Sequence, residues 1–194
     1  MDEATLRRQV CQAVHQLWTR GLIAGDEGVV TAQLHRQRFL ATPPHRRRAD
    51  LEPQDLVCLD MEGASIQGQA GLDPSAWRPH RAAYLAGAER EAHADSGSGQ
   101  PPLIRATILA MPVSVAALVR SCDGAARLNI AGTSLPVLDL EDEQGFHQAL
   151  EESPVAALRS GELLACGPSL AQVLNRVETI EHAARIELIL RSQR

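Results

Sequence analysis

Residues 163–190 read LLACGPSLAQVLNRVETIEHAARIELIL, a short apolar run placed directly before a long amphipathic segment. Leu163 to Cys166 is typical of a buried strand. Ser169 and Gln172 form a capping box, and the apolar residues after them recur three and four positions apart, which predicts a long C-terminal helix. A strand followed at once by a packing helix is typical of α/β proteins.

Strands and helices alternate along the rest of the chain as well. Helices are predicted at Thr5–Arg20, Pro79–Ala94, Pro112–Val119 and Glu143–Glu152, and strands at Val29–Leu34, Arg38–Ala41, Leu56–Leu59, Ile104–Ala110 and Leu135–Leu138. Residues 71–79 have the composition of a loop, and residues 95–102 that of a flexible surface loop. With no internal repeat, the sequence predicts one α/β domain over residues 1–194 with a single core.

Composition excludes several classes of protein. A chain of 194 residues with 44% hydrophobic residues, 22% charged residues and a net charge of -5 is typical of a globular protein, and it contains no dominant basic patch for nucleic acid. All 19 basic residues are arginine. The absence of lysine excludes Schiff-base catalysis, a pyridoxal-phosphate lysine and a phosphate-loop lysine.

Cysteine usage and hydropathy indicate the compartment. Cys11, Cys58, Cys122 and Cys166 form no CxxC pair, so we expect them to be reduced and buried. No apolar run approaches the roughly 18 residues of a membrane span, and the N-terminus lacks the apolar stretch of a secretory signal. The sequence therefore predicts a cytoplasmic protein without a membrane partner.

Local catalytic motifs are missing from the chain. None of the seven histidines is in HxH, HExxH or HxxxH spacing, and no GxSxG, phosphate-loop or GxGxxG motif occurs. A zinc site assembled from His45, His80 and His93 stays open beside the alternative of solvated histidines. Glu178, Glu181, His182 and Arg185 have the spacing of ordinary helix-surface pairs.

Two other features could form part of a binding site. The run from His45 to Arg48 is the one dense cationic cluster, and arginine binds phosphate or carboxylate through a two-pronged fork. The alternatives for this run are a solvated loop and an ion-paired subunit contact. Trp77, between Pro74 and Pro79, is large enough either to cover a pocket or to fill one, and we expect it to fill one.

Five segments in chain order resemble the class II aldolase and adducin head-domain family, of the fuculose-phosphate aldolase type. They read LWTRGLIAGDEGVVTAQL, FLATPP, LEPQDLVCLDMEG, LDPSAWRPH and IEHAARIELIL, and the resemblance covers about residues 6–190. It implies a three-layer α/β/α fold around a mostly antiparallel sheet, and a homotetramer with active sites at subunit contacts.

The resemblance also implies that this chain is a divergent member of the family. The family binds zinc through a His-x-His pair after a buried strand and through a later histidine, and an acidic residue transfers protons. The resemblance places Ile108 and Ala110 at the positions of the His-x-His pair, and Trp77 at the position of the acidic residue. The later histidine is missing as well, because no histidine lies between Leu163 and Ser169. Since the side chains at these positions cannot ligate a metal, the resemblance implies no metal, no cofactor and no catalytic residues.

The family's phosphate-binding positions are kept in part. The Gly-Asn pair of the family is Gly28-Val29 here, its Thr-Pro-Ser-Gly turn is Thr42 to His45, and its Ser-Ser pair is Ser75-Ala76. The resemblance therefore implies a degenerate anion pocket formed by Gly28, Thr42, Ser75, Arg46, Arg47 and Arg48 and lined by Trp77, Ile108 and Ala110.

The leading expectation is a catalytically inactive, metal-free relative of these aldolases that acts as an oligomeric binding or scaffold module, with a small anion as its ligand. An alternative is an active aldehyde-lyase or isomerase on small phosphorylated or carboxylated sugars, with a relocated metal site. A third hypothesis is a subunit that completes the active site of an aldolase paralogue.

Overall fold

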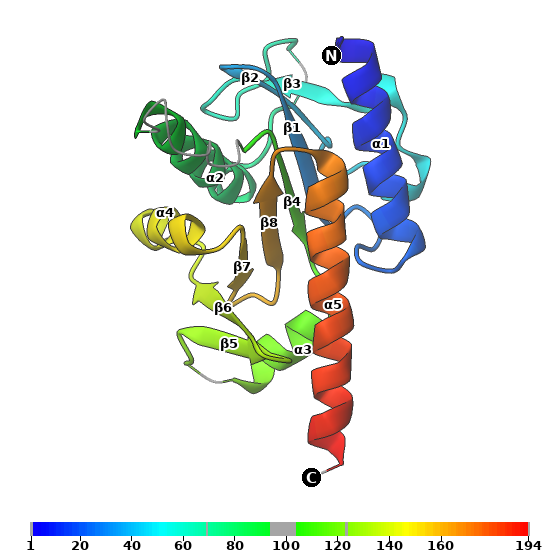
Figure 1. The fold of residues 1–194 in the computed structure, drawn as a ribbon. Helices are drawn as coiled ribbons and strands as arrows, with labels where there is room; N and C mark the ends of the chain where they lie inside the picture. The colour runs from blue at the N-terminus through cyan, green and yellow to red at the C-terminus, as the bar shows by residue number, and fades with distance from the viewer. Residues whose placement is uncertain (1, 69, 94–103, 123, 194) are drawn as a thin grey trace.

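The computed structural model describes residues 2–68, 70–93, 104–122 and 124–193 (Figure 1). The predicted surface loop at 95–102 lies outside these ranges. No helix of the described residues is long and apolar enough to cross a membrane.

The helices begin at residues that can satisfy free backbone N–H groups. Asp2, Asp142 and Ser169 each accept a hydrogen bond from a backbone N–H in the first turn of the helix that follows. The helices are α1 (Glu3–Thr19), α2 (Pro74–His93), α3 (Val113–Ser121), α4 (Glu143–Glu152) and α5 (Leu170–Ser192), with short 3-10 helices η1 (Arg48–Asp50) and η2 (Pro53–Asp55).

Eight strands form one sheet in the order β3-β2-β1-β4-β8-β7-β6-β5. They are β1 (Val29–His35), β2 (Arg38–Ala41), β3 (Val57–Leu59), β4 (Ala106–Ala110), β5 (Arg127–Ile130), β6 (Thr133–Leu138), β7 (Val155–Leu158) and β8 (Leu163–Gly167). Every pair of neighbours is antiparallel except β6 and β7, which are parallel. The mostly antiparallel sheet is as predicted.

Helices cover both faces of this sheet, which makes three layers. In Figure 1, α2 and α4 lie on one side of the sheet, and α1 and α5 lie on the other. The buried apolar residues correspondingly form two clusters, one shared with α1, α3 and α5 and one shared with α2 and α4. The three-layer α/β/α prediction is confirmed, but the core is divided in two by the sheet.

Strand β4, in the middle of the sheet, contributes to both clusters. Side chains of a strand point to opposite faces in turn. Accordingly Ile108 and Ala110 join the cluster beneath α1 and α5, whereas Leu109 joins the cluster beneath α2 and α4. Trp77 of α2 belongs to the second cluster. The sheet therefore separates Trp77 from Ile108 and Ala110, and these three side chains do not line one pocket as predicted.

Helix α2 begins a full turn earlier than predicted. Residues 74–79, expected to be loop, are its first turns, and Pro79 lies inside the helix. Asp73 makes this start possible, because its Oδ1 accepts hydrogen bonds from the backbone N–H and the hydroxyl of Ser75. Pro79 removes one helical hydrogen bond, from the carbonyl of Ser75, and that residue is exposed, so water can replace the bond.

Glu181 on α5 is an interior residue, although it also pairs with the exposed Arg185 of the same helix at 3.7 Å. Glu181 is 5% exposed. Its carboxylate accepts hydrogen bonds from the backbone N–H groups of Ser114 and Val115 at 3.1–3.2 Å. Because these N–H groups open α3, a carboxylate is well placed there. The bonds attach the long C-terminal helix to the helix that follows β4.

Candidate functional site

A chain of hydrogen-bonded side chains crosses the interface between β1, β4 and α2. The Thr31 hydroxyl lies 2.7 Å from the Tyr84 hydroxyl and 2.6 Å from the Thr107 hydroxyl, which in turn lies 2.5 Å from Nδ1 of His80. All four side chains are buried. Burial raises the pKa of Tyr84 and lowers the pKa of His80 to about 3. The chain is therefore uncharged at neutral pH.

Aromatic rings pack against the His80 end of this hydrogen-bonded chain. Trp77 is 2% exposed, and its Nε1 donates to the carbonyl of Met61 at 2.8 Å. Its ring centre lies 5.4 Å from that of Phe39 and 6.1 Å from that of His80. The tryptophan therefore fills the space between α2 and the sheet, and does not form the lid of an open pocket.

The described residues do not fit the zinc ion that members of the resembled family bind. Ile108 and Ala110 are apolar and buried, and no group of three or more His, Cys, Asp and Glu side chains in the described ranges could hold a metal ion. Of the relocated donors, His45 is exposed at the surface and His80 is in the buried chain, with no hydrogen-bond partner on its Nε2 within the described part. The side chain of His93 is outside the described residues.

Arg48 has a different role from the predicted one. It is 2% exposed, and its guanidinium donates to four backbone carbonyls at 2.8–3.1 Å, those of Glu27, Gly28, Pro43 and Arg46. Burial lowers the pKa of Arg48 to about 10, so it stays charged at neutral pH. All of its nitrogens are used within the protein. Arg48 therefore joins two loops and does not offer its fork to an anion.

Gly28 and Thr42 meet at the same two loops. Gly28 has a φ of 76°, and a Cβ there would lie 2.6 Å from Cγ2 of Ile23, so the position requires glycine. Thr42 is fully buried, and its hydroxyl accepts a hydrogen bond from the backbone N–H of Val30. His45 has a φ of 56° where the family's turn has its glycine. The Thr42–His45 segment therefore still forms a turn, but the hydroxyl of Thr42 is bonded inside the protein.

The remaining predicted residues have other partners. Arg46 pairs with Asp55 at 3.2 Å and Arg47 with Asp50 at 3.8 Å, both near the surface. Ser75 bonds to Asp73 at the start of α2. The structure thus brings together Gly28, Thr42 and Arg48, and it does so by satisfying their hydrogen bonds internally.

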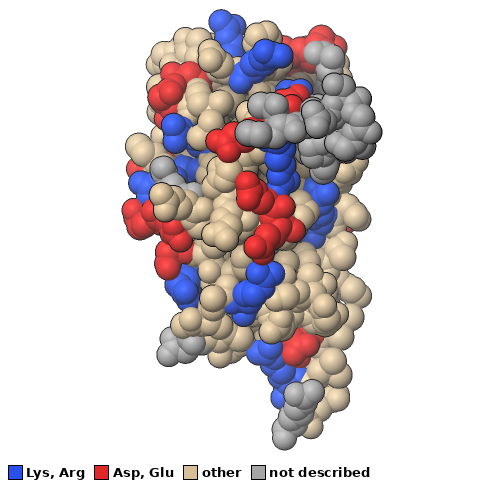
Figure 2. Space-filling view, turned by 60° about the vertical axis from the view of Figure 1, so that its left-hand side comes forward, with Lys and Arg blue, Asp and Glu red and all other residues tan. Residues whose placement is uncertain are grey.

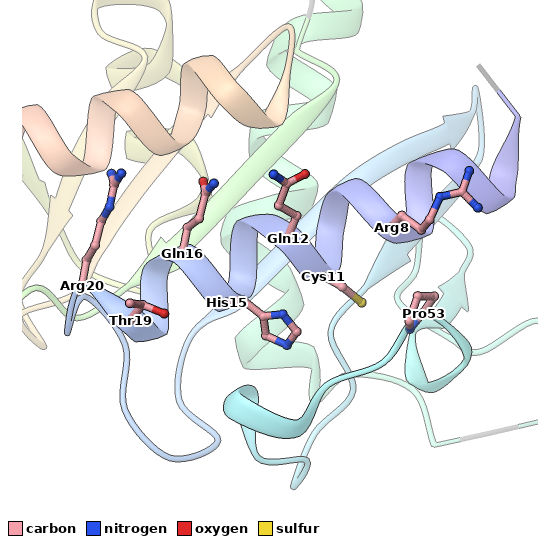
Figure 3. A pocket seen from close by; sticks show the side chains of 8 residues that line it. All are labelled: Arg8, Cys11, Gln12, His15, Gln16, Thr19, Arg20 and Pro53. Atoms are coloured by element: carbon pink, nitrogen blue, oxygen red, sulfur yellow. The ribbon is translucent and has the colours of Figure 1, made fainter.

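An open groove of about 510 Å³ runs along the outer side of α1 (Figure 3). Figure 3 shows Gln12, Gln16 and Arg20 on one side of the helix and Cys11 and His15 on the other, so these groups do not converge on one point. Burial raises the pKa of Cys11 to about 11. The thiol is therefore protonated at neutral pH and is a poor nucleophile.

The burial of the cysteines agrees with the sequence except at Cys122. All four cysteines are free; Cys11, Cys58 and Cys166 are buried, and Cys122 is partly exposed. On the face seen in Figure 2, basic and acidic side chains are interspersed, without a large area of one sign. This face has no basic patch for a polyanion.

Comparisons with known proteins show the fold and the family that part of the chain is similar to. Residues 8–97 match the family model described as Class II Aldolase and Adducin N-terminal domain. The resemblance is confirmed. No curated protein sequence matches the chain at a significant level.

Solved aldolase structures are similar over almost the whole chain. L-fuculose-1-phosphate aldolase from Thermus thermophilus is 23% identical, with a TM-score of 0.73 over 97% of this chain and 95% of that one. YgbL from Klebsiella pneumoniae is 21% identical, with a TM-score of 0.78 over 98% and 91%. An aldolase II superfamily protein from Pseudomonas syringae is 15% identical, with a TM-score of 0.78 over 98% and 76%. The chain has the class II aldolase fold.

The buried chain from Tyr84 to His80 is not predicted by the sequence. Thr31, Tyr84 and Thr107 lie far apart along this class II aldolase-like chain, and isolated threonines in apolar strands carry no pattern that sets them apart. A usable signal is the pair His80 and Tyr84, spaced four apart on one helix face.

Stability should depend on pH through His80. Its pKa in the folded protein is lowered to about 3, against 6.5 for an unperturbed histidine. Between these values only the unfolded chain takes up the proton, so the free energy of unfolding falls as pH drops from 6.5 towards 3, by up to about 1.4 kcal/mol per pH unit. His80→Gln should flatten this slope in urea unfolding, and His15→Gln, at an exposed histidine, should not. Equal slopes in both variants would refute the assignment.

Arg48→Lys should destabilise the protein although it keeps the charge. An ammonium cannot reach four carbonyls in the plane of a guanidinium, so we expect a loss of about 2–3 kcal/mol in the free energy of unfolding. Arg47→Lys at the exposed neighbour should change it by less than about 0.5 kcal/mol. If both variants unfold at the wild-type urea concentration, Arg48 does not join the two loops as described.

Proposed function

We propose that this chain is a class II aldolase-like binding or scaffold module that assembles into homo-oligomers and does not perform zinc-dependent aldol chemistry. The proposal takes residues 1–194 as one domain, because strands from residue 29 to residue 167 share one sheet. The observation that carries the proposal is the apolar, fully buried environment of Ile108 and Ala110.

The chemistry of the chain supports the loss of activity. An aldol cleavage leaves a carbanion that needs an electron sink, either a metal ion or an imine formed on lysine. The chain has no lysine, and the described residues offer no metal-binding group. Trp77 adds a second reason, because it fills the space where the resemblance expects a carboxylate.

An anion pocket at Gly28, Thr42, Ser75 and Arg46 to Arg48 is disfavoured within this proposal. Arg48 and Thr42 are bonded internally, and Arg46 and Arg47 already pair with carboxylates. An anion would have to displace those partners.

Oligomer formation is supported by the end of α5. In Figure 1 this helix extends beyond the sheet, away from the rest of the protein. Ile186, Ile189 and Leu190 on this part are 41%, 52% and 49% exposed, and their spacing places them on one side of the helix. Large apolar side chains grouped on a projecting helix favour a contact with another chain. A second copy is the partner we propose, with the tetramer of the resemblance as the expected state.

Zinc content and aldol cleavage test the catalytic part of the proposal. Protein purified without a His tag or chelators, exposed to zinc and dialysed, should retain far less than one zinc per chain, because the donors are missing. It should not cleave L-fuculose 1-phosphate, with the Thermus enzyme as positive control for the assay. One zinc per chain that is lost in a His45→Gln, His93→Gln double variant would support the relocated metal site and overturn the proposal.

Sedimentation velocity tests the oligomer. The wild-type protein should sediment as a homo-oligomer, and Ile189→Glu should shift it to smaller species because a charge would be buried in the contact. Ile66→Glu is the matched control, since Ile66 is 45% exposed on another part of the surface. A monomeric wild type, or equal behaviour of the two variants, would contradict an interface on α5.

A further inference from the structure

Residues of α2 and α4 line a small cavity. Figure 1 shows these two helices on the side of the sheet opposite to α1 and α5. The volume of the cavity is about 250 Å³. That is below the roughly 300–1,000 Å³ of pockets for drug-sized ligands, so it suits a small metabolite. The cavity is lined by Arg78, Arg81, Ala82 and Leu85 of α2 and by Gln144 and His147 of α4.

The lining divides into an apolar wall and a set of nitrogen-bearing side chains. Ala82 and Leu85 provide the wall, and most of the exposed lining is apolar. Arg78, Arg81, Gln144 and His147 provide N–H groups, and no carboxylate lines the cavity among the described residues. Such a combination fits a molecule with an apolar body and one negatively charged end.

Carboxylates outside the cavity hold two of these groups in place. Arg78 pairs with Glu141 at 2.7 Å. His147 lies 2.7 Å from Glu89 of α2 and 3.7 Å from Glu151 of its own helix. The Arg78–Glu141 ion pair and the contact between His147 and Glu89 connect α2 to α4 and to the segment before it.

Arg81 is different from its neighbours. It is only partly exposed, and the described residues give it neither a hydrogen bond nor an ion pair. A partly buried guanidinium without a partner is unfavourable, and its planar fork matches a carboxylate. A ligand that supplies a carboxylate would satisfy it.

We propose that the cavity between α2 and α4 binds a small organic carboxylate, with its carboxylate on Arg81 and its apolar body against Ala82 and Leu85. The single guanidinium of Arg81 and the apolar wall of Ala82 and Leu85 favour a monocarboxylate. Inorganic phosphate would need hydrogen-bond donors around all of its oxygens. The site is independent of the zinc question and lies on a different surface from the end of α5.

Isothermal titration calorimetry with benzoate tests the proposal. Benzoate should bind one site per chain, and benzamide, which has the same shape without the charge, should bind at least about tenfold more weakly, as expected for the loss of one charge-assisted pair. Inorganic phosphate should not compete with benzoate. Absence of benzoate binding, equal binding of benzamide, or competition by phosphate would each overturn the proposal.

Two variants and a control assign the binding to the cavity. Arg81→Gln should weaken benzoate binding at least about tenfold without lowering the melting temperature, because Arg81 has no partner to lose among the described residues. Ala82→Leu should also weaken it, by filling the cavity without a change of charge. Arg36→Gln, at an exposed arginine between β1 and β2, removes the same charge and should bind as the wild type does. Wild-type affinity in Arg81→Gln would place any benzoate elsewhere and refute the site.

Discussion

Strand β4 is buried on both faces, and this double burial is the constraint on which the rest of the structure depends. A strand with helices on both sides must distribute its side chains between two interiors. Ile108 therefore packs under α5 while its neighbour Thr107 bonds to His80 on the other side. Apolar side chains at β4 strengthen one interior at the position where the family resemblance expects metal ligands. In this chain these positions of β4 take part in packing.

The loops at Gly28 and Thr42 are likewise held by hydrogen bonds within the protein. Their backbone conformation still has the form of a turn with a residue in the left-handed region, now His45. Arg48 uses its guanidinium to hold the loops together through their carbonyls. An arginine in that position is ambiguous in a sequence, because the fork that binds an anion also binds backbone oxygens. Only its burial and its partners decide between the two roles.

Local sequence signals are sufficient for several elements. The bounds of α4 and β2 agree with the prediction, since Asp142 caps the helix and the β2 strand lies between polar residues. Strands β5 and β7 are not predicted by the sequence. The β7 strand, Val155–Leu158, contains two alanines, which have low strand propensity, and it exists because β6 and β8 pair with it. The first turn of α2 escapes prediction because its prolines suggest a loop.

The sequence by itself determined the alternation of strands and helices, the absence of lysine chemistry and the family resemblance, because these follow from residue types and their spacing. It could not determine which face of the sheet each residue of β4 enters, that Glu181 caps α3, or that Arg81 remains without a partner among the described residues. Those outcomes depend on groups distant in sequence meeting in space. Only the tertiary structure decides whether a charge is exposed, paired or left for a ligand.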